Sequence, residues 1–186
     1  MRLSGALEWA AIAVVSLAVA FGAIALLSGF FAGRDQAGVG GTGTLPGITF
    51  ADLGHAHLRP GQSHPRYNSD PPTSGAHVPV PVDGDNRQLS DNQLLEALEL
   101  GDVVVMYRSS APPSGLRSLV SSLAAPFTPA LAAAGQAVVL ARRPGTTGLI
   151  ALAWAHMLRV PTPGDPRLQS FINYWLGRGA PVGARP

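Results

Sequence analysis

The sequence predicts an α/β fold, in which an N-terminal transmembrane helix is followed by a small α/β sandwich with a mixed sheet. Three observations support this prediction. The 186 residues are about one domain's worth of chain, a long apolar stretch lies near the N-terminus, and helix-like and strand-like apolar runs alternate in the second half. A hydrophobic content of 46% with 13% charged residues excludes a disordered polyelectrolyte.

The first element is a membrane span. Residues 9–33 carry no charge, and the nearly continuous apolar run from 10 to 31 is long enough to cross a hydrocarbon core of about 30 Å at about 1.5 Å per residue. A cleaved signal peptide is the alternative, although its apolar core is typically about 7–15 residues. Arg2 precedes the span, whereas Arg34 and Asp35 cancel behind it. We therefore expect residues 1–8 in the cytoplasm, one crossing of the cytoplasmic membrane, and a C-terminal domain outside.

A Gly-rich linker follows at residues 34–47, and its composition is typical of a flexible tether. The outer domain then occupies residues 48–186. Its first part, residues 51–89, is rich in Gly, Pro, His and Asp without sustained periodicity, which predicts loops with at most short strands.

The first helix of the outer domain begins after Ser90, which forms a capping-box pattern with Gln93, and it ends at Gly101. A run of β-branched residues at 103–107 predicts a strand directly afterwards. Residues 116–123 show the spacing of a short amphipathic helix.

Two further apolar runs, 137–141 and 149–155, predict strands, and the intervening turn residues 143–148 predict that they form a hairpin. The last helix covers residues 166–176, with Asp165 as its cap and a glycine after its end. The order helix, strand, helix, strand, strand, helix indicates helices that cover a mixed sheet.

Composition excludes several chemistries. The chain has no cysteine, which removes disulfides, thiolate metal sites and iron-sulfur clusters. It has no lysine, and its 13 arginines form no aromatic-rich basic cluster, so nucleic acid is not an expected partner. Charge is nevertheless divided: residues 51–102 hold eight acids and three arginines, whereas the chain from 103 onward holds eight arginines and one acid, Asp165.

The acidic part also contains four of the five histidines, namely His55, His57, His64 and His77. Imidazoles among carboxylates suit a divalent transition metal, and without thiolates we expect Zn²⁺ or Cu²⁺. In an extended segment, residues two apart point to the same side, so His55 and His57 could reach one ion. The alternative is that these are ordinary solvated loop histidines, and that His156 is a lone histidine in an apolar strand.

Residues 67–77 contain an unusual motif made of Tyr67, Asn68, Pro71, Pro72, Thr73, Ser74, Gly75 and His77. It resembles the signature Tyr-Asn-x-x-Pro-Pro-Thr-Ser-Gly-x-His of the bacterial domain-of-unknown-function family number 3105. The resemblance extends more loosely from His57 to the final helix. It implies a short, membrane-tethered, extracytoplasmic protein with no established activity.

The same family usually carries His-x-Leu-Glu-His-Gly before the valine strand, which suggests a second pair of ligands. Here residues 96–101 read Glu-Ala-Leu-Glu-Leu-Gly, so Glu96 and Leu100 stand at the two histidine positions. Two interpretations follow from the resemblance. Either His55 and His64 compensate, with Glu96 or Glu99 as oxygen ligands, or this member has kept the fold and lost the site.

Two catalytic interpretations are weaker. Ser74 lacks a Gly-x-Ser-x-Gly elbow and has no lysine partner, and the 145–148 turn lacks the Lys and the helix of a phosphate-binding loop. We therefore predict no catalytic residues.

The expected function is a membrane-anchored, non-enzymatic domain that binds a transition metal through its loop histidines. The alternative is an accessory or interaction subunit of a membrane complex without a metal site. Its arginine-rich half would then meet an acidic partner or anionic headgroups.

Overall fold

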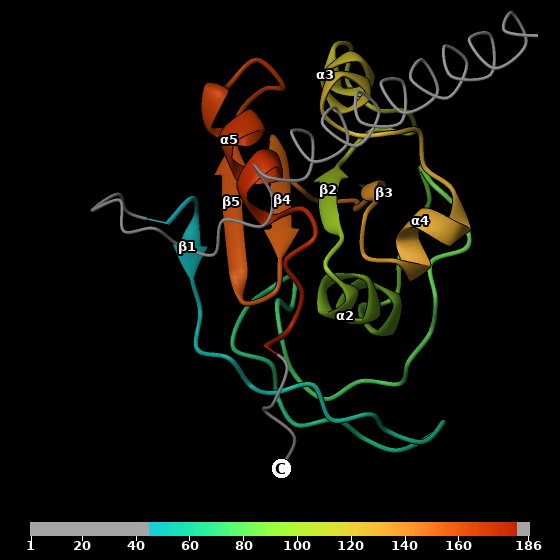
Figure 1. Cartoon of the computed structure of the whole chain (residues 1–186). Helices are drawn as coiled ribbons and strands as arrows, with labels where there is room; N and C mark the ends of the chain where they lie inside the picture. The colour runs from blue at the N-terminus through green and yellow to red at the C-terminus, as the bar shows by residue number, and fades with distance from the viewer. Residues whose placement is uncertain (1–44, 182–186) are drawn as a thin grey trace, which may run out of the picture. The chain divides into compact units, whose positions relative to one another are not determined.

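A five-stranded mixed sheet organises residues 45–181, the part of the chain that the computed structural model describes (Figure 1). In spatial order the strands are β1 (Ile48–Thr49), β5 (His156–Val160), β4 (Leu149–Ala153), β2 (Val103–Tyr107) and β3 (Val138–Arg142). Only β2 and β3 run parallel, and the other neighbours are antiparallel. This arrangement confirms the predicted α/β fold with a mixed sheet.

Helices cover both faces of the sheet. They are α2 (Asp91–Leu100), α3 (Leu116–Leu123), α4 (Pro129–Ala133) and α5 (Pro166–Trp175). Because side chains alternate along a strand, Val104 and Met106 of β2 pack in the core with residues of α2 and α4, whereas Val105 and Tyr107 pack with residues of α3 and α5. Apart from the exposed two-residue strand β1, the strands are largely buried on both faces, which explains their mostly apolar sequences.

The predicted ends of the two longest helices are confirmed. The Ser90 side chain accepts the backbone N–H of Gln93, and the Gln93 side chain accepts the N–H of Ser90, which completes the capping box of α2. Gly101 ends this helix in the left-handed conformation, at φ 116°. Asp165 caps α5 by accepting the N–H of Arg167.

The predicted hairpin across residues 143–148 is wrong. Strand β2 lies between β3 and β4, and β3 pairs in parallel with β2 because α3 and α4 supply the crossover between them. The true hairpin joins β4 to β5 and turns at residues 154–155, where Ala155 has φ 59°. The predicted strand 149–155 is therefore too long by two residues. His156, expected to be a lone histidine in an apolar strand, is the first residue of β5.

The short elements β1 and α4 were not predicted, because two or five residues carry too little periodicity to be recognised. Residues 51–89 form loops with isolated bridges, as expected. The expected span at 9–33 and most of the 34–47 linker lie outside the described residues. Within residues 45–181, no helix has both the length and the apolar composition that a membrane crossing needs.

Candidate metal centre

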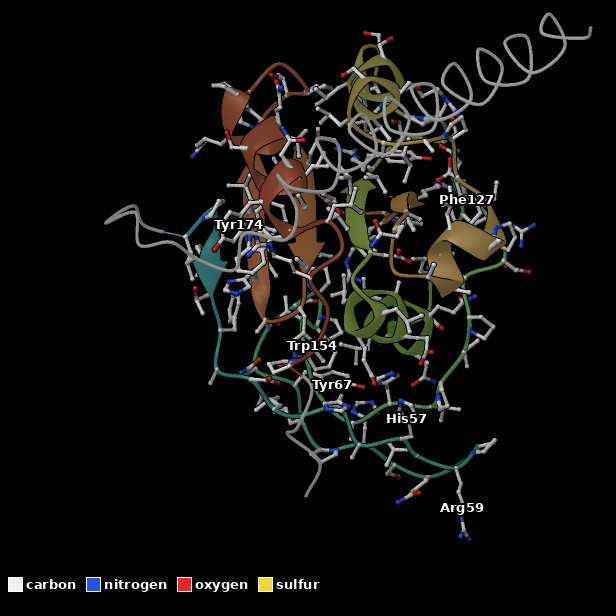
Figure 2. All side chains as sticks on the ribbon, viewed as in Figure 1. His57, Arg59, Tyr67, Phe127, Trp154 and Tyr174 are labelled. Carbon is white, nitrogen blue, oxygen red and sulfur yellow. The ribbon has the colours of Figure 1, made fainter. Side chains whose placement is uncertain are left out.

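The two histidines of the family-like pattern, His57 and His77, are held side by side by backbone pairing. They form an isolated parallel bridge, in which the N–H of Leu58 donates to the His77 carbonyl at 2.8 Å and the N–H of His77 donates to the Ala56 carbonyl at 3.1 Å. Their ring centroids are 5.4 Å apart. Figure 2 shows His57 below α2. His57 belongs to the loop region of residues 51–89, which is called the wrapping segment below. Residues twenty positions apart in the sequence are thus brought to one point.

Helix α2 supplies two carboxylates to the same point. Glu96 and Glu99 are three residues apart, a spacing that places both on one face of the helix. The opposite face is fixed in the core by residues such as Leu94 and Leu98, which are almost fully buried. The capping box and the Gly101 stop therefore determine where these two carboxylates point.

Four donor atoms converge, one each from His57, His77, Glu96 and Glu99, and all lie within 4.8 Å of one another. The Nε2 atom of His77 is 3.3 Å from Glu96 Oε2 and 3.4 Å from Glu99 Oε2. The Nε2 atom of His57 is 3.2 Å from the same Glu99 oxygen. Ligands bound at about 2.0–2.1 Å in a tetrahedron are about 3.3 Å apart, so these three separations match edges of a tetrahedral site.

The tautomer of His77 is determined by its second nitrogen. Nδ1 lies 3.0 Å from the carbonyl oxygen of Gly75, which can only accept, so Nδ1 carries a proton. In the neutral ring, Nε2 then directs a lone pair at the carboxylates of Glu96 and Glu99. That contact is repulsive unless a proton or a metal cation lies between them. A backbone carbonyl that accepts the N–H of one ring nitrogen and leaves the other nitrogen to bind a cation is the arrangement common around metal-bound histidines.

The end of α2 favours a cation for a second reason. The carbonyl end of a helix carries partial negative charge, and Glu99 adds a full negative charge in its last turn, where no basic residue is present. His77, whose side chain is fully buried, faces this charge from the wrapping segment together with His55 and His57. A positive ion among the four donors would offset both the helix end and the two carboxylates.

His55 lies outside the group of four donors but contacts one of them. Its Nδ1 is 3.1 Å from Glu99 Oε1, while Oε2 of the same carboxylate faces His57 and His77. His55 and His57 therefore contact one common group, which is the carboxylate of Glu99. The other nitrogen of His55 is buried and has no hydrogen-bond partner among the described residues. His55 therefore contacts Glu99 from outside the group of four donors.

The structure does not bring His64 or Leu100 into the site. His64 is exposed, its Nδ1 lies 2.8 Å from the carbonyl oxygen of Pro65, and its ring stacks on Tyr67. Leu100, which stands at a histidine position of the family pattern, is 41% exposed and belongs to no group of donors. Only Glu96 places a metal-ligating side chain where the family usually has histidine.

The motif segment 67–77 acts as the support of His77. Pro71, Pro72 and Thr73 are buried, and the Thr73 carbonyl accepts the N–H of Ala155 at 2.8 Å. Gly75 has φ 129°, and an added Cβ would meet the ring of Tyr67 at 3.0 Å, so a side chain is excluded there. This packing holds the backbone that presents His77.

Ser74 is buried and bonded to backbone groups. Its hydroxyl accepts the N–H of Leu53 at 3.1 Å and donates to the Ala51 carbonyl at 3.5 Å. These bonds tie the start of the wrapping segment to the motif. A structural role accounts for this serine.

Comparison with known proteins agrees with the resemblance noted in the sequence. The sequence model of the family described as "Protein of unknown function (DUF3105)" matches residues 59–184. No curated protein matches the chain. No solved structure matches it either.

Proposed function

We propose, for a chain that belongs to the DUF3105 family of proteins of unknown function, that the outer domain binds one divalent transition-metal ion at His57, His77, Glu96 and Glu99. The convergence of these four donors within 4.8 Å is the observation that carries the proposal. We further propose that residues 9–33 anchor the chain in the cytoplasmic membrane and that the domain lies outside the cytoplasm.

The donor set favours particular ions. Two imidazole nitrogens and two carboxylate oxygens suit Zn²⁺ and Cu²⁺, whereas Cu⁺ prefers sulfur ligands, which this site lacks. Zn²⁺ binds readily to tetrahedral sets of this kind, and three of the donor separations have tetrahedral values. Zn²⁺ is therefore our first choice and Cu²⁺ the second.

The replacement of a family histidine by Glu96 is consistent with a retained site. A carboxylate at this position still offers a lone pair, and its Oε2 lies 3.3 Å from His77. If the site had been lost, an apolar residue could stand at position 96, as Leu100 does at the other histidine position of the family pattern. The geometry thus favours compensation by the glutamates over loss.

The experiment uses the full-length chain without an affinity tag, purified from the membrane fraction in mild detergent and dialysed against Zn²⁺ or Cu²⁺. We expect one ion per chain by elemental analysis. Glu99→Gln and His57→Asn should weaken binding by about 10–100-fold. Both side chains are partly exposed, so neither change should prevent folding.

His64→Asn is the matched control, because His64 is also an exposed histidine of the wrapping segment but lies outside the four donors. A metal-free wild type, or equal losses in His57→Asn and His64→Asn, contradicts the metal site and favours an interaction module without metal. Recovery of the full chain in the soluble fraction contradicts the membrane anchor.

A further inference from the structure

A polar cavity lined by none of the four metal donors lies between the start of the Pro-Pro-Thr-Ser-Gly stretch and the turn at residues 143–148. Its volume is about 380 Å³. One wall comes from the motif segment, at Asp70 and Pro71, and another from the turn between β3 and β4, at Thr146 and Thr147. This turn does not join two paired strands, and its residues line the cavity instead.

Two arginines meet in the cavity, each from a different element. Arg143 follows β3 and Arg159 belongs to β5. Arg143 pairs with the carboxylate of Asp70, and Arg159 donates to the Asp70 backbone carbonyl at 2.8 Å. Within residues 45–181 these are the side-chain hydrogen bonds of the two guanidinium groups. Each guanidinium has five N–H donors, so most remain available to a ligand.

The carboxylate of Asp70 stands where an anionic ligand would bind. Its side chain is 86% exposed, so its contact with Arg143 is its tie to the protein surface. An exposed ion pair of this kind is weak, so a ligand with more negative charge can displace it. Thr146, which is buried, and Thr147 also line the cavity and carry no charge.

We propose that this cavity binds a phosphate group through Arg143 and Arg159. The planar fork of a guanidinium matches two phosphate oxygens, and two forks supply the charge that a dianion requires. The lining contains neither a lysine nor the start of a helix, which distinguishes it from a nucleotide phosphate-binding loop. The site shares no residue with the four metal donors, so it stands or fails independently of the metal proposal.

Inorganic phosphate is the probe, titrated calorimetrically into the full-length chain in detergent after removal of metal with a chelator. We expect saturable binding with a dissociation constant below about 1 mM. Arg143→Gln and Arg159→Gln should each weaken binding about tenfold or more. Asp70→Asn should strengthen it by up to about fivefold, because the competing carboxylate is gone.

Asp70→Asn and Arg143→Gln break the same ion pair, so opposite effects on phosphate affinity separate binding from any loss of stability. Arg59→Gln is the charge-matched control, since Arg59 is exposed and points away from the domain (Figure 2). No saturable binding up to about 10 mM phosphate, or the same change in Arg59→Gln as in Arg143→Gln, overturns the proposal.

Short-chain phosphatidic acid, compared with glycerol phosphate, identifies the source of the group. Tighter binding of the lipid points to a headgroup, whereas equal or tighter binding of glycerol phosphate points to a soluble phosphate ester. Either result supports the site. If neither ester binds and inorganic phosphate shows no saturable binding, the proposal is overturned.

Discussion

Two histidines are buried in the described part of the chain, and their surroundings differ in chemistry. His77 is fully buried and faces the carboxylates of Glu96 and Glu99. His156 is 8% exposed, its ring stacks on Trp175 at a centroid distance of 3.7 Å, and its Nδ1 lies 3.2 Å from the hydroxyl of Thr49. Both are buried, but in this part of the chain the carboxylates that lie beside a buried histidine belong to the surroundings of His77.

The comparison shows that burial alone does not make a cation site. Desolvation lowers the pKa of His156, which keeps that ring neutral. Asp102 is the acidic counterpart, because it is buried without a positive partner and burial raises its pKa to about 7. Its Oδ1 accepts the N–H of Ala137 at 2.8 Å, but its Oδ2 has no partner among the described residues. Burial thus favours the neutral forms of His156 and Asp102. Around His77, by contrast, two carboxylates lie close together.

Alanine at each of the two buried histidines gives the largest expected effect. His77→Ala removes the bond to Gly75 and leaves two carboxylates facing each other, so we expect a loss of about 3–4 kcal/mol in the free energy of unfolding together with the loss of metal binding. His156→Ala should cost about 2–3 kcal/mol but leave metal binding intact. Urea unfolding and elemental analysis measure the two effects.

Adding Glu96→Gln to His77→Ala tests the electrostatic part of this loss. The second change should restore about 1 kcal/mol, because it removes one of two facing charges. If the double variant is as unstable as the single one, the carboxylates do not repel and the difference between the two histidines is one of packing.

Asp102→Asn should give the next largest effect, and only above acidic pH. The folded chain keeps the Asp102 proton up to about pH 7, whereas the unfolded chain loses it near the ordinary aspartate value. Stability therefore falls as pH rises between these two values, and the full penalty persists above them. We expect the Asn variant to exceed the wild type by about 2–3 kcal/mol near pH 9 and by little near pH 4. If the difference in stability between the two proteins does not change with pH, the raised pKa of Asp102 is not its cause.

The elements that the sequence predicted well are those fixed by local chemistry. Ser90, Gln93 and Gly101 act within one helix, and the apolar pattern of β2 depends on neighbours in the chain. The hairpin prediction failed because strand pairing is a long-range choice: the turn at 143–148 has hairpin composition, but β2 already occupies the position beside β3. No local signal in that turn reports this.

The candidate site divides in the same way. The motif and the residue types indicated His57 and His77, and the glutamates followed from their place in the family pattern. The separate roles of His55 and His64 depend on how the wrapping segment folds back, which brings one to Glu99 and leaves the other exposed. From their sequence positions, both histidines are candidate ligands. The folded path of the chain decides which of them reaches Glu99.

His156→Phe gives the smallest expected effect on stability. It should protect the fold at low pH, whereas Asp102→Asn should protect it at high pH. A lowered pKa means that the unfolded chain takes up a proton before the folded chain does, so this histidine destabilises the fold as pH falls below its ordinary value. Phenylalanine keeps the stack on Trp175 and cannot be protonated, so the wild type should lose about 1 kcal/mol more than the variant between about pH 7.5 and pH 5.

Thr49→Val is the control, because it removes the hydroxyl but leaves the buried ring, and it should keep the acid sensitivity of the wild type. If His156→Phe is as acid-sensitive as the wild type, then the apolar surroundings of His156 do not set its charge, and the contrast with His77 loses its physical basis.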